Sequence, residues 1–274
     1  LLPRKNLKII KLDIRNYEKI PFKKVDVVVH LANIANDPSV ELNPKLSWEV
    51  NVLATQKLIE QAIKNKVKQF LYASSGSVYG VKKEKQVTED LTLMPISTYN
   101  KTKMIAERVL KSYENKIKLH CIRPATVCGY SPRMRLDVSV NMFVFQALKY
   151  KSITVFGGKQ IRPNIHIQDL INVYKHFILN PNLPRGFYNA GFENLKIIDI
   201  AKKVSKIIPS KIIIKKNIDI RSYRQNSKKL LSSGFVQKFS VLDAIKEIKE
   251  KYESKKFKES SKCYTVKWMK KINL

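Results

Sequence analysis

The chain has 274 residues, long enough to bury a large hydrophobic core without disulfides or structural metals. Its composition, 44% hydrophobic and 27% charged, excludes global disorder, a collagen-like fibre and a coiled-coil rod. Lysine and arginine together number 53 against 22 acidic residues, which gives a formal net charge of +31.

This basic excess consists mostly of lysine, because only ten residues are arginine. Surfaces that bind phosphates or guanine bases use the planar fork of arginine more heavily than this. We therefore interpret the excess as the composition of a lysine-rich proteome, and we do not expect nucleic acid as a partner. A surface that binds polyanions or acidic membranes is the alternative.

Cysteine usage and hydropathy indicate a protein of the reducing cytoplasm. Cys121, Cys128 and Cys263 form no Cys-x-x-Cys pair, so neither a zinc ribbon nor a disulfide framework is predicted. No His, Cys, Asp or Glu cluster has metal-ligand spacing, so no metal site is expected. The sequence also has no signal-peptide pattern and no apolar run of about 18 residues, which a membrane span would need.

The first half of the chain alternates short apolar runs with helical patterns. Strands between helices of a dozen or more residues indicate parallel βαβ units, with a sheet covered by helices on both faces. Strands are predicted at 7–12, 25–30, 69–73 and 117–122, and helices at 48–62 and 97–113.

The second half is less regular and begins with a loop at 129–137. Further helices are predicted at 138–150, 169–179, 197–208 and 241–252, and strands at 153–156, 164–167, 186–190 and 211–214. The last segment, 255–274, carries many lysines with little apolar pattern, so we interpret it as a solvated basic tail.

A Tyr-x-x-x-Lys motif is the strongest chemical signal, because side chains four residues apart share one face of a helix. The motif occurs three times, at Tyr79/Lys83, Tyr99/Lys103 and Tyr252/Lys256, and a chain this rich in lysine would contain several by chance. Only Tyr99/Lys103 stands in a predicted helix that follows the serine-rich end of a buried strand. Ligands of open α/β folds bind at this carboxyl edge of the sheet.

Segments throughout the chain carry a family resemblance. They are LDIRN at 12–16, VVHLANIA at 28–35, EVNVLATQKLI at 49–59, LYASSGSVYG at 71–80, STYNKTK at 97–103, IRPATVCGYSP at 122–132, VNMF at 140–143, QIRPNIHIQDL at 160–170 and DIRSYRQNSKKL at 219–230. In this order they resemble the extended short-chain dehydrogenase/reductases, specifically the nucleotide-sugar epimerases and dehydratases. The resemblance implies a Rossmann-type, doubly wound parallel sheet with a smaller substrate-binding domain towards the C-terminus.

The resemblance also implies roles for individual residues. The catalytic residues would be Ser75, Tyr99 and Lys103. The NAD-binding residues would be Asp13, Ile14, Leu31, Ala32, Asn33, Asn51, Ala73, Tyr99, Lys103 and Ala125. A nucleoside-diphosphate sugar would bind to Ser75, Thr126, Asn141, Arg162 and Arg221. Arg133 and Arg135 are either solvated loop charges or contacts to the phosphates or the sugar.

In this scheme Tyr99 is the base that removes a proton from a sugar hydroxyl. We expect the Lys103 ammonium and the nicotinamide ring to lower its pKa from the usual value of about 10. Ser75 would hydrogen-bond the same sugar oxygen. Hydride transfer to NAD, rotation of the keto sugar and return of the hydride would invert the carbon.

Which reaction follows depends on the residues after Ser75. Members that eliminate water carry an Asp-Glu pair there, whereas this chain has Gly76 and Ser77. Epimerisation is therefore favoured, with dehydration or reduction of a keto sugar as the alternatives within the family. A non-catalytic module that binds polyanions is the alternative outside it.

The family opens with a glycine-rich turn that grips the pyrophosphate of NAD, whereas the first glycine here is Gly76. We therefore expect an N-terminally truncated fragment that lacks the first β-α-β unit, with exposed strand edges and weak NAD binding. The predicted domains are a truncated NAD-binding domain at 1–129, to which 166–191 return, a nucleotide-sugar-binding domain at 130–165 and 192–254, and the tail. The resemblance further implies a homodimer.

Overall fold

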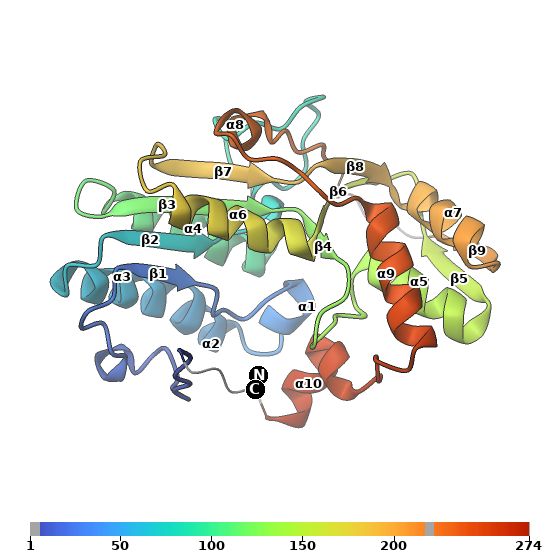
Figure 1. Cartoon of the computed structure of the whole chain (residues 1–274), viewed down its shortest axis with the longest axis horizontal. Coiled ribbons are helices and arrows are strands. Elements are labelled where there is room, and N and C mark those ends of the chain that lie inside the picture. The colour runs from blue at the N-terminus through green and yellow to red at the C-terminus, as the bar shows by residue number, and fades with distance from the viewer. Residues whose placement is uncertain (1–5, 217–221, 274) are drawn as a thin grey trace.

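In the computed structural model, which describes residues 6–216 and 222–273, a four-stranded parallel sheet forms the larger part of the fold (Figure 1). Its strands, in spatial order, are β1 (Val27–His30), β2 (Gln69–Ala73), β3 (Lys118–Pro124) and β7 (Gly186–Ala190). The two inner strands are buried on both faces, as the apolar runs of their sequences predict for a covered parallel sheet.

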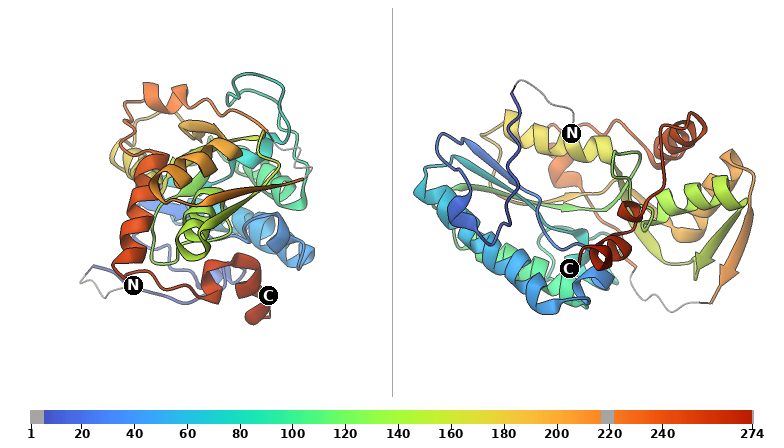
Figure 2. Two further views of the ribbon diagram at one scale, coloured as in Figure 1. Left: turned by 90° about the vertical axis from the view of Figure 1, so that its right-hand side faces the viewer. Right: turned by 90° about the horizontal axis from the view of Figure 1, so that it is seen from below.

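Helices cover both faces of this sheet, with α3 (Ala54–Lys64) and α4 (Thr98–Lys111) on one face and α6 (Ile167–Leu179) on the other (Figure 2). The α4 helix begins where predicted, because the Ser97 hydroxyl accepts a hydrogen bond from the Asn100 amide and caps the first turn. This arrangement confirms the predicted Rossmann-type α/β fold. Within the described residues, no helix is long and apolar enough to cross a membrane.

The loop after β1 leads into short helical segments before α3. They are α1 (Asp37–Val40), α2 (Pro44–Trp48) and the π-helical turn η2 (Glu49–Leu53). The predicted helix at 48–62 is thus part of a longer run, interrupted by one wide turn around Asn51. Two 3-10 turns are η1 (Tyr17–Lys19) and η3 (Gly76–Tyr79).

Smaller sheets and three helices make up the second part of the fold. The strands β4 (Thr126–Cys128), β6 (Ile161–His166) and β8 (Glu193–Lys196) form one sheet, and β5 (Ser152–Phe156) pairs with β9 (Lys211–Lys215). The helices α5 (Ser139–Tyr150), α7 (Ile197–Ile207) and α9 (Val241–Glu253) share one apolar core with β5, and α8 (Lys228–Ser232) packs near β7. The exact domain boundaries remain a prediction.

The segment 7–12 is not a strand, contrary to the prediction. Its residues are exposed and have no regular secondary structure. A strand needs a hydrogen-bonding neighbour, and β1, the nearest strand in the sequence, pairs with β2 alone among the described strands. The apolar pattern of LKIIKL therefore has no partner in the described structure.

The C-terminal segment also differs from the prediction of a solvated tail. It forms a 3-10 turn, η4 (Ser261–Cys263), and a helix, α10 (Thr265–Lys271). Cys263 and Met269 are buried, and Met269 packs in one cluster with Ile34, Val40 and Leu46. Tertiary contacts therefore order this segment despite its many lysines.

Candidate active site

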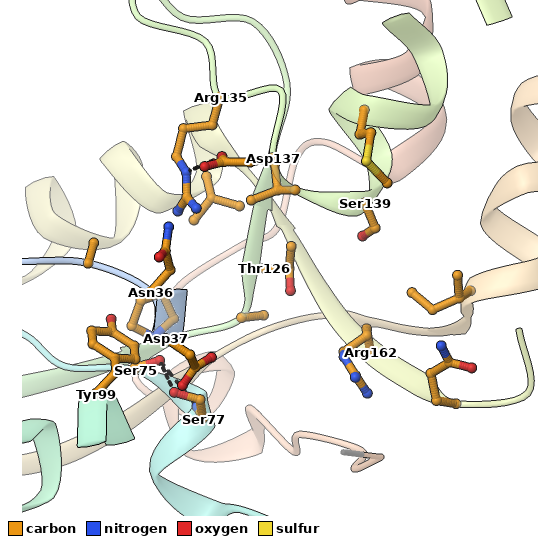
Figure 3. A pocket seen from close by; sticks show the side chains of 18 of the residues that line it. Asn36, Asp37, Ser75, Ser77, Tyr99, Thr126, Arg135, Asp137, Ser139 and Arg162 are labelled. Carbon is orange, nitrogen blue, oxygen red and sulfur yellow. Dashed lines mark hydrogen bonds and ion pairs between the residues drawn. The ribbon is translucent and has the colours of Figure 1, made fainter. Parts of the chain in front are cut away.

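A pocket of about 540 Å³ opens at the carboxyl end of the parallel sheet, between this sheet and the second part of the fold (Figure 3). The loops after β1, β2 and β3 form one wall, and β5, β6 and the start of α5 form the other. Residues from both predicted domains therefore face one cavity. Its volume is in the range of sites that bind small molecules.

Two of the predicted catalytic residues meet in this pocket. Ser75 caps η3, with its hydroxyl 3.2 Å from the Ser77 amide and 2.8 Å from the Ser77 hydroxyl. Tyr99, in the first turn of α4, lines the same pocket. Figure 3 shows the Tyr99 ring beside Ser75. Ser75 and Tyr99 are thus placed to contact one substrate oxygen.

The electrostatics of Tyr99 differ from the expectation. Burial is the largest influence and raises the pKa of Tyr99 to about 12, whereas the hydrogen bond with Ser75 and the charge of Arg135 act to lower it. The expected lowering by Lys103 is not among the causes of the shift. The Lys103 ammonium is buried one turn along α4 and donates instead to the Ala73 carbonyl, at 2.7 Å.

Lys103 is itself strongly perturbed. Its ammonium also lies 3.3 Å from the Tyr72 hydroxyl and 4.8 Å from the centre of the Tyr72 ring. Burial lowers the pKa of Lys103 to about 7, and the nearby Glu107 carboxylate partly opposes this effect. Lys103 can therefore gain or lose a proton near neutral pH, and perturbed groups of this kind are typical of functional sites.

Sequence reasoning missed two acidic residues of the pocket, Asp37 and Asp137, and left the role of Arg135 open. Asp37, in α1, accepts a hydrogen bond from the Ser97 hydroxyl, and its charge acts to raise the pKa of Tyr99. Arg135 donates to Asp137 at 2.8 Å, and both residues line the pocket (Figure 3). No local motif marks these residues, because loops distant in the sequence bring them together.

The predicted substrate-binding residues separate into two groups. Thr126 and Arg162 both line the pocket, and Arg162 lies on the wall opposite Tyr99. Asn141 is buried and bonds instead to the loop before α5: its amide oxygen accepts from the Gly129 amide at 3.0 Å, and its amide nitrogen donates to the Arg135 carbonyl at 3.0 Å. It therefore holds this loop in place. Arg221 lies outside the described residues.

Several of the predicted NAD-binding residues gather beside β1. Ile14, Leu31 and Ala32 line a second cavity of about 390 Å³, together with apolar residues of β1 and the segment before it. Asp13 is partly exposed and forms an ion pair with Arg15 at 2.7 Å. This apolar cavity has the character needed to cover the flat face of an aromatic ring.

The remaining residues that were predicted to bind NAD do not line this second cavity. Ala125 lines the first pocket, and the Asn33 side chain donates to the Leu31 carbonyl. Asn51 is used internally: its amide group bonds both to the backbone amide and to the carbonyl of Ile34, at 2.8 and 3.0 Å. The structure therefore makes Asn51 an anchor of the loop after β1.

Unpartnered polar atoms test whether these residues fit NAD. The Ser74 hydroxyl lines the first pocket, and the side-chain amide oxygen of Asn33 lies in the loop after β1. Both atoms are buried without a hydrogen-bond partner among the described residues. A nucleotide that spans the two cavities would offer partners to such atoms. The residues around both cavities thus fit NAD, except that a glycine-rich turn for the pyrophosphate is not among them.

Comparison with known proteins agrees with this geometry. The family model for the NAD dependent epimerase/dehydratase family matches residues 2–191, more than half of the chain. This chain belongs to the NAD dependent epimerase/dehydratase family. A relative described as an uncharacterized UDP-glucose epimerase, YtcB of Bacillus subtilis, is 29% identical over 212 residues, which are 75% of this chain and 67% of the relative.

Other family members extend the comparison to dehydratases and to solved structures. A dTDP-D-glucose 4,6-dehydratase of Dictyostelium discoideum is 29% identical over 199 residues, which are 68% of this chain and 45% of the relative. A UDP-glucuronic acid 4-epimerase of Bacillus cereus, solved with UDP-glucuronic acid and NAD, is 26% identical, with a TM-score of 0.76 over 90% of this chain and 79% of that one. The chain thus spans about half to two thirds of these curated relatives.

Proposed function

We propose that this member of the family carries the base and the substrate pocket of an NAD-dependent nucleotide-sugar epimerase. The meeting of Tyr99 and Ser75 in one pocket at the carboxyl end of a parallel sheet carries the proposal, with Lys103 buried one turn along the same helix as Tyr99. The distribution of charge supports a nucleoside-diphosphate sugar as substrate: Arg162 lies on the wall opposite Tyr99, and its guanidinium fork suits a diphosphate.

Each residue has a distinct task in the proposed reaction. Tyr99 takes a proton from a sugar hydroxyl, and Ser75 holds the same oxygen by a hydrogen bond. When bound, NAD supplies a reversible hydride acceptor, so the sugar carbon becomes a ketone. The keto sugar then turns within the pocket and is reduced again on its other face, which inverts the carbon. Because the pKa of Tyr99 is about 12, a positive charge must favour its phenolate during proton transfer.

Dehydration is a second candidate, and one observation favours it. Gly76 and Ser77 occupy the places of the Asp-Glu pair that the dehydratases of this family carry, which favours epimerisation. However, Asp37 brings a carboxylate into the pocket from a different element. The two reactions are distinguished by product mass, since dehydration removes one water and epimerisation leaves the mass unchanged.

Incubation of the chain with NAD and with UDP-glucose, UDP-glucuronic acid or dTDP-glucose tests the proposal, with products identified by mass spectrometry and NMR. We expect an epimer of unchanged mass, and Tyr99→Phe should lower the rate by about 10²-fold or more, the usual contribution of a general base. Tyr150→Phe is the matched control, because Tyr150 is an exposed tyrosine. Activity that survives Tyr99→Phe would show that another group is the base.

A binding measurement covers the case in which this chain binds NAD too weakly to turn over. Isothermal titration with UDP should then show an interaction that Arg162→Ala weakens and Tyr150→Phe leaves unchanged. If neither UDP nor any of the nucleotide sugars binds, the proposed substrate class is wrong.

We further infer that the protein acts in the cytoplasm, in the synthesis of surface-polysaccharide precursors. A homodimer through α2, α3 and α4 is supported by the exposure of Trp48 and Leu53 on the first part of this layer. Light scattering tests the dimer, and Leu53→Lys should shift the mass to that of a monomer. A monomeric wild-type chain would contradict it.

A further inference from the structure

The C-terminal segment connects the two walls of the pocket. Cys263 is buried in the core formed by α5, α7 and α9, whereas Met269 is buried against Ile34 and Val40, beside α1. Figure 2 shows the C-terminal helix between these two parts of the molecule. A segment of seven residues therefore crosses from the core of the second part to the start of the first.

Along this path the segment bonds directly to the loop that precedes α5. The Cys263 carbonyl accepts a hydrogen bond from the Leu136 amide, at 2.8 Å. The Thr265 amide donates to one carboxylate oxygen of Asp137, at 2.9 Å. Because these are backbone groups of an ordered segment, they fix Asp137 without depending on a flexible side chain.

The other carboxylate oxygen of Asp137 positions Arg135. It accepts the hydrogen bond from Arg135 Nε, at 2.8 Å, and the Arg135 guanidinium then lies in the pocket above Asn36 (Figure 3). Asp137 carries a pKa below its usual value because Arg135 and Thr265 bond to its charged form, although burial opposes this. The carboxylate is thus ionised at neutral pH and pairs with a charged guanidinium.

Arg135 in turn acts on the reacting end of the site. Its positive charge is one of the influences that lower the pKa of Tyr99, against the larger effect of burial. A cation is what the proposed base needs as it becomes a phenolate. With Nε bonded to Asp137, the terminal nitrogens of the planar guanidinium face the cavity where the sugar would lie.

We propose that the segment from Cys263 to Met269 is a positioning element of the active site, which acts through Thr265 and Asp137 to hold the Arg135 guanidinium in the pocket that Tyr99 also lines, where its charge acts on Tyr99 and on the sugar of the substrate. The proposal rests on the proposed function for the identity of the ligand. The geometry of the Thr265, Asp137 and Arg135 chain does not depend on it.

The first test follows Arg135 without any ligand. In ¹⁵N spectra of arginine side chains, the Arg135 Nε–H signal is assigned by its loss in Arg135→Lys. In the wild type we expect the Arg135 Nε–H group to be rigid and slow to exchange with water. Met269→Lys should release α10 from its packing, and the Arg135 Nε–H group should then be as mobile as that of a surface arginine. Lys270→Ala is the matched control, because Lys270 lies on the exposed side of α10.

The second test measures binding of UDP-glucose and of UDP. Arg135→Gln and Met269→Lys should each lower the affinity for UDP-glucose by about tenfold, which is the usual effect of losing one charge-assisted hydrogen bond. Neither variant should change the affinity for UDP. The double variant should bind like either single variant, because both changes remove the same contact. If Met269→Lys does not fold, Asp137→Asn takes its place in both tests.

Two results would overturn the proposal. In the first, amide exchange shows that α10 is released in Met269→Lys, yet the Arg135 Nε–H group stays rigid. In the second, the double variant loses affinity for UDP-glucose by the product of the two single losses. Absence of binding to both UDP-glucose and UDP by the wild type would refute the proposed substrate class instead. In that case the mobility of the Arg135 side chain alone decides the role of the segment.

Discussion

Replacement of Asn51 by alanine distinguishes an NAD contact from an internal anchor. Asn51 is 1% exposed, and its amide group bonds to the Ile34 backbone amide, the Ile34 carbonyl and the Thr102 hydroxyl, at 2.8, 3.0 and 3.1 Å. These bonds tie the loop after β1, which leads to α1 and the pocket, to the helix that carries Tyr99. Alanine would remove all of them.

The expected cost follows from the backbone groups that lose their partner. A buried polar group without a hydrogen bond costs about 1–3 kcal/mol, and the Ile34 amide and carbonyl would both be left in this state. We therefore expect Asn51→Ala to lower the free energy of unfolding by about 3 kcal/mol. Thr102→Val removes one side-chain partner of Asn51 and the bond from the Thr102 hydroxyl to the Tyr99 carbonyl, and it leaves the Ile34 bonds intact, so it should cost about 1–2 kcal/mol.

Urea denaturation without NAD, monitored by tryptophan fluorescence, measures both variants. Wild-type, Asn51→Ala and Thr102→Val chains should unfold with the same dependence on urea and with different midpoints. A loss below about 1 kcal/mol for Asn51→Ala would refute the anchor. If Asn51→Ala then also bound NAD more weakly than the wild type, Asn51 would contact NAD, as the family resemblance implies.

Three further experiments test a buried ion pair, a tight turn and the buried lysine near the site. Glu107→Gln should lower the free energy of unfolding by about 3–5 kcal/mol, because the buried Arg123 guanidinium would lose the charged carboxylate that it pairs with at 2.7 Å. A loss below about 1 kcal/mol in urea denaturation would contradict this. Gly80→Ala should lower the free energy of unfolding by at least about 2 kcal/mol more than Gly234→Ala, because the new Cβ at position 80 would stand 1.9 Å from a backbone carbonyl oxygen. Gly234 is the control, since it also has a positive φ but open space around it. Equal melting temperatures of the two variants would refute the clash. Burial lowers the pKa of Lys103 to about 7 in the folded chain, so above pH 7 the Lys103 side chain carries a proton in the unfolded chain but not in the folded one. The free energy of unfolding should therefore rise between pH 7 and 8.5, by up to about 1.4 kcal/mol per pH unit. If Lys103→Met shows the same slope, Lys103 is not its source.

The sequence by itself determined the parallel α/β architecture and part of the site. Burial patterns with a period of two or 3.6 residues are local, so the strands around Phe70 and the helix around Tyr99 were predicted close to their observed bounds. Because Tyr99 and Lys103 are four residues apart on one helix, their shared face also followed from the sequence. The family resemblance assigned Ser75, and its place after a strand of the same sheet agrees with that assignment.

The tertiary structure alone decided which partner each polar group has. Asn51 and Asn141 were predicted to contact ligands, yet both satisfy backbone groups of loops distant in the sequence. The apolar segment 7–12 lacks a neighbouring strand, and the lysine-rich C-terminus is ordered by Met269 and Cys263. The physical reason is that periodicity in a sequence indicates which residues are buried, whereas a hydrogen bond or an ion pair depends on which distant segments approach within about 3 Å.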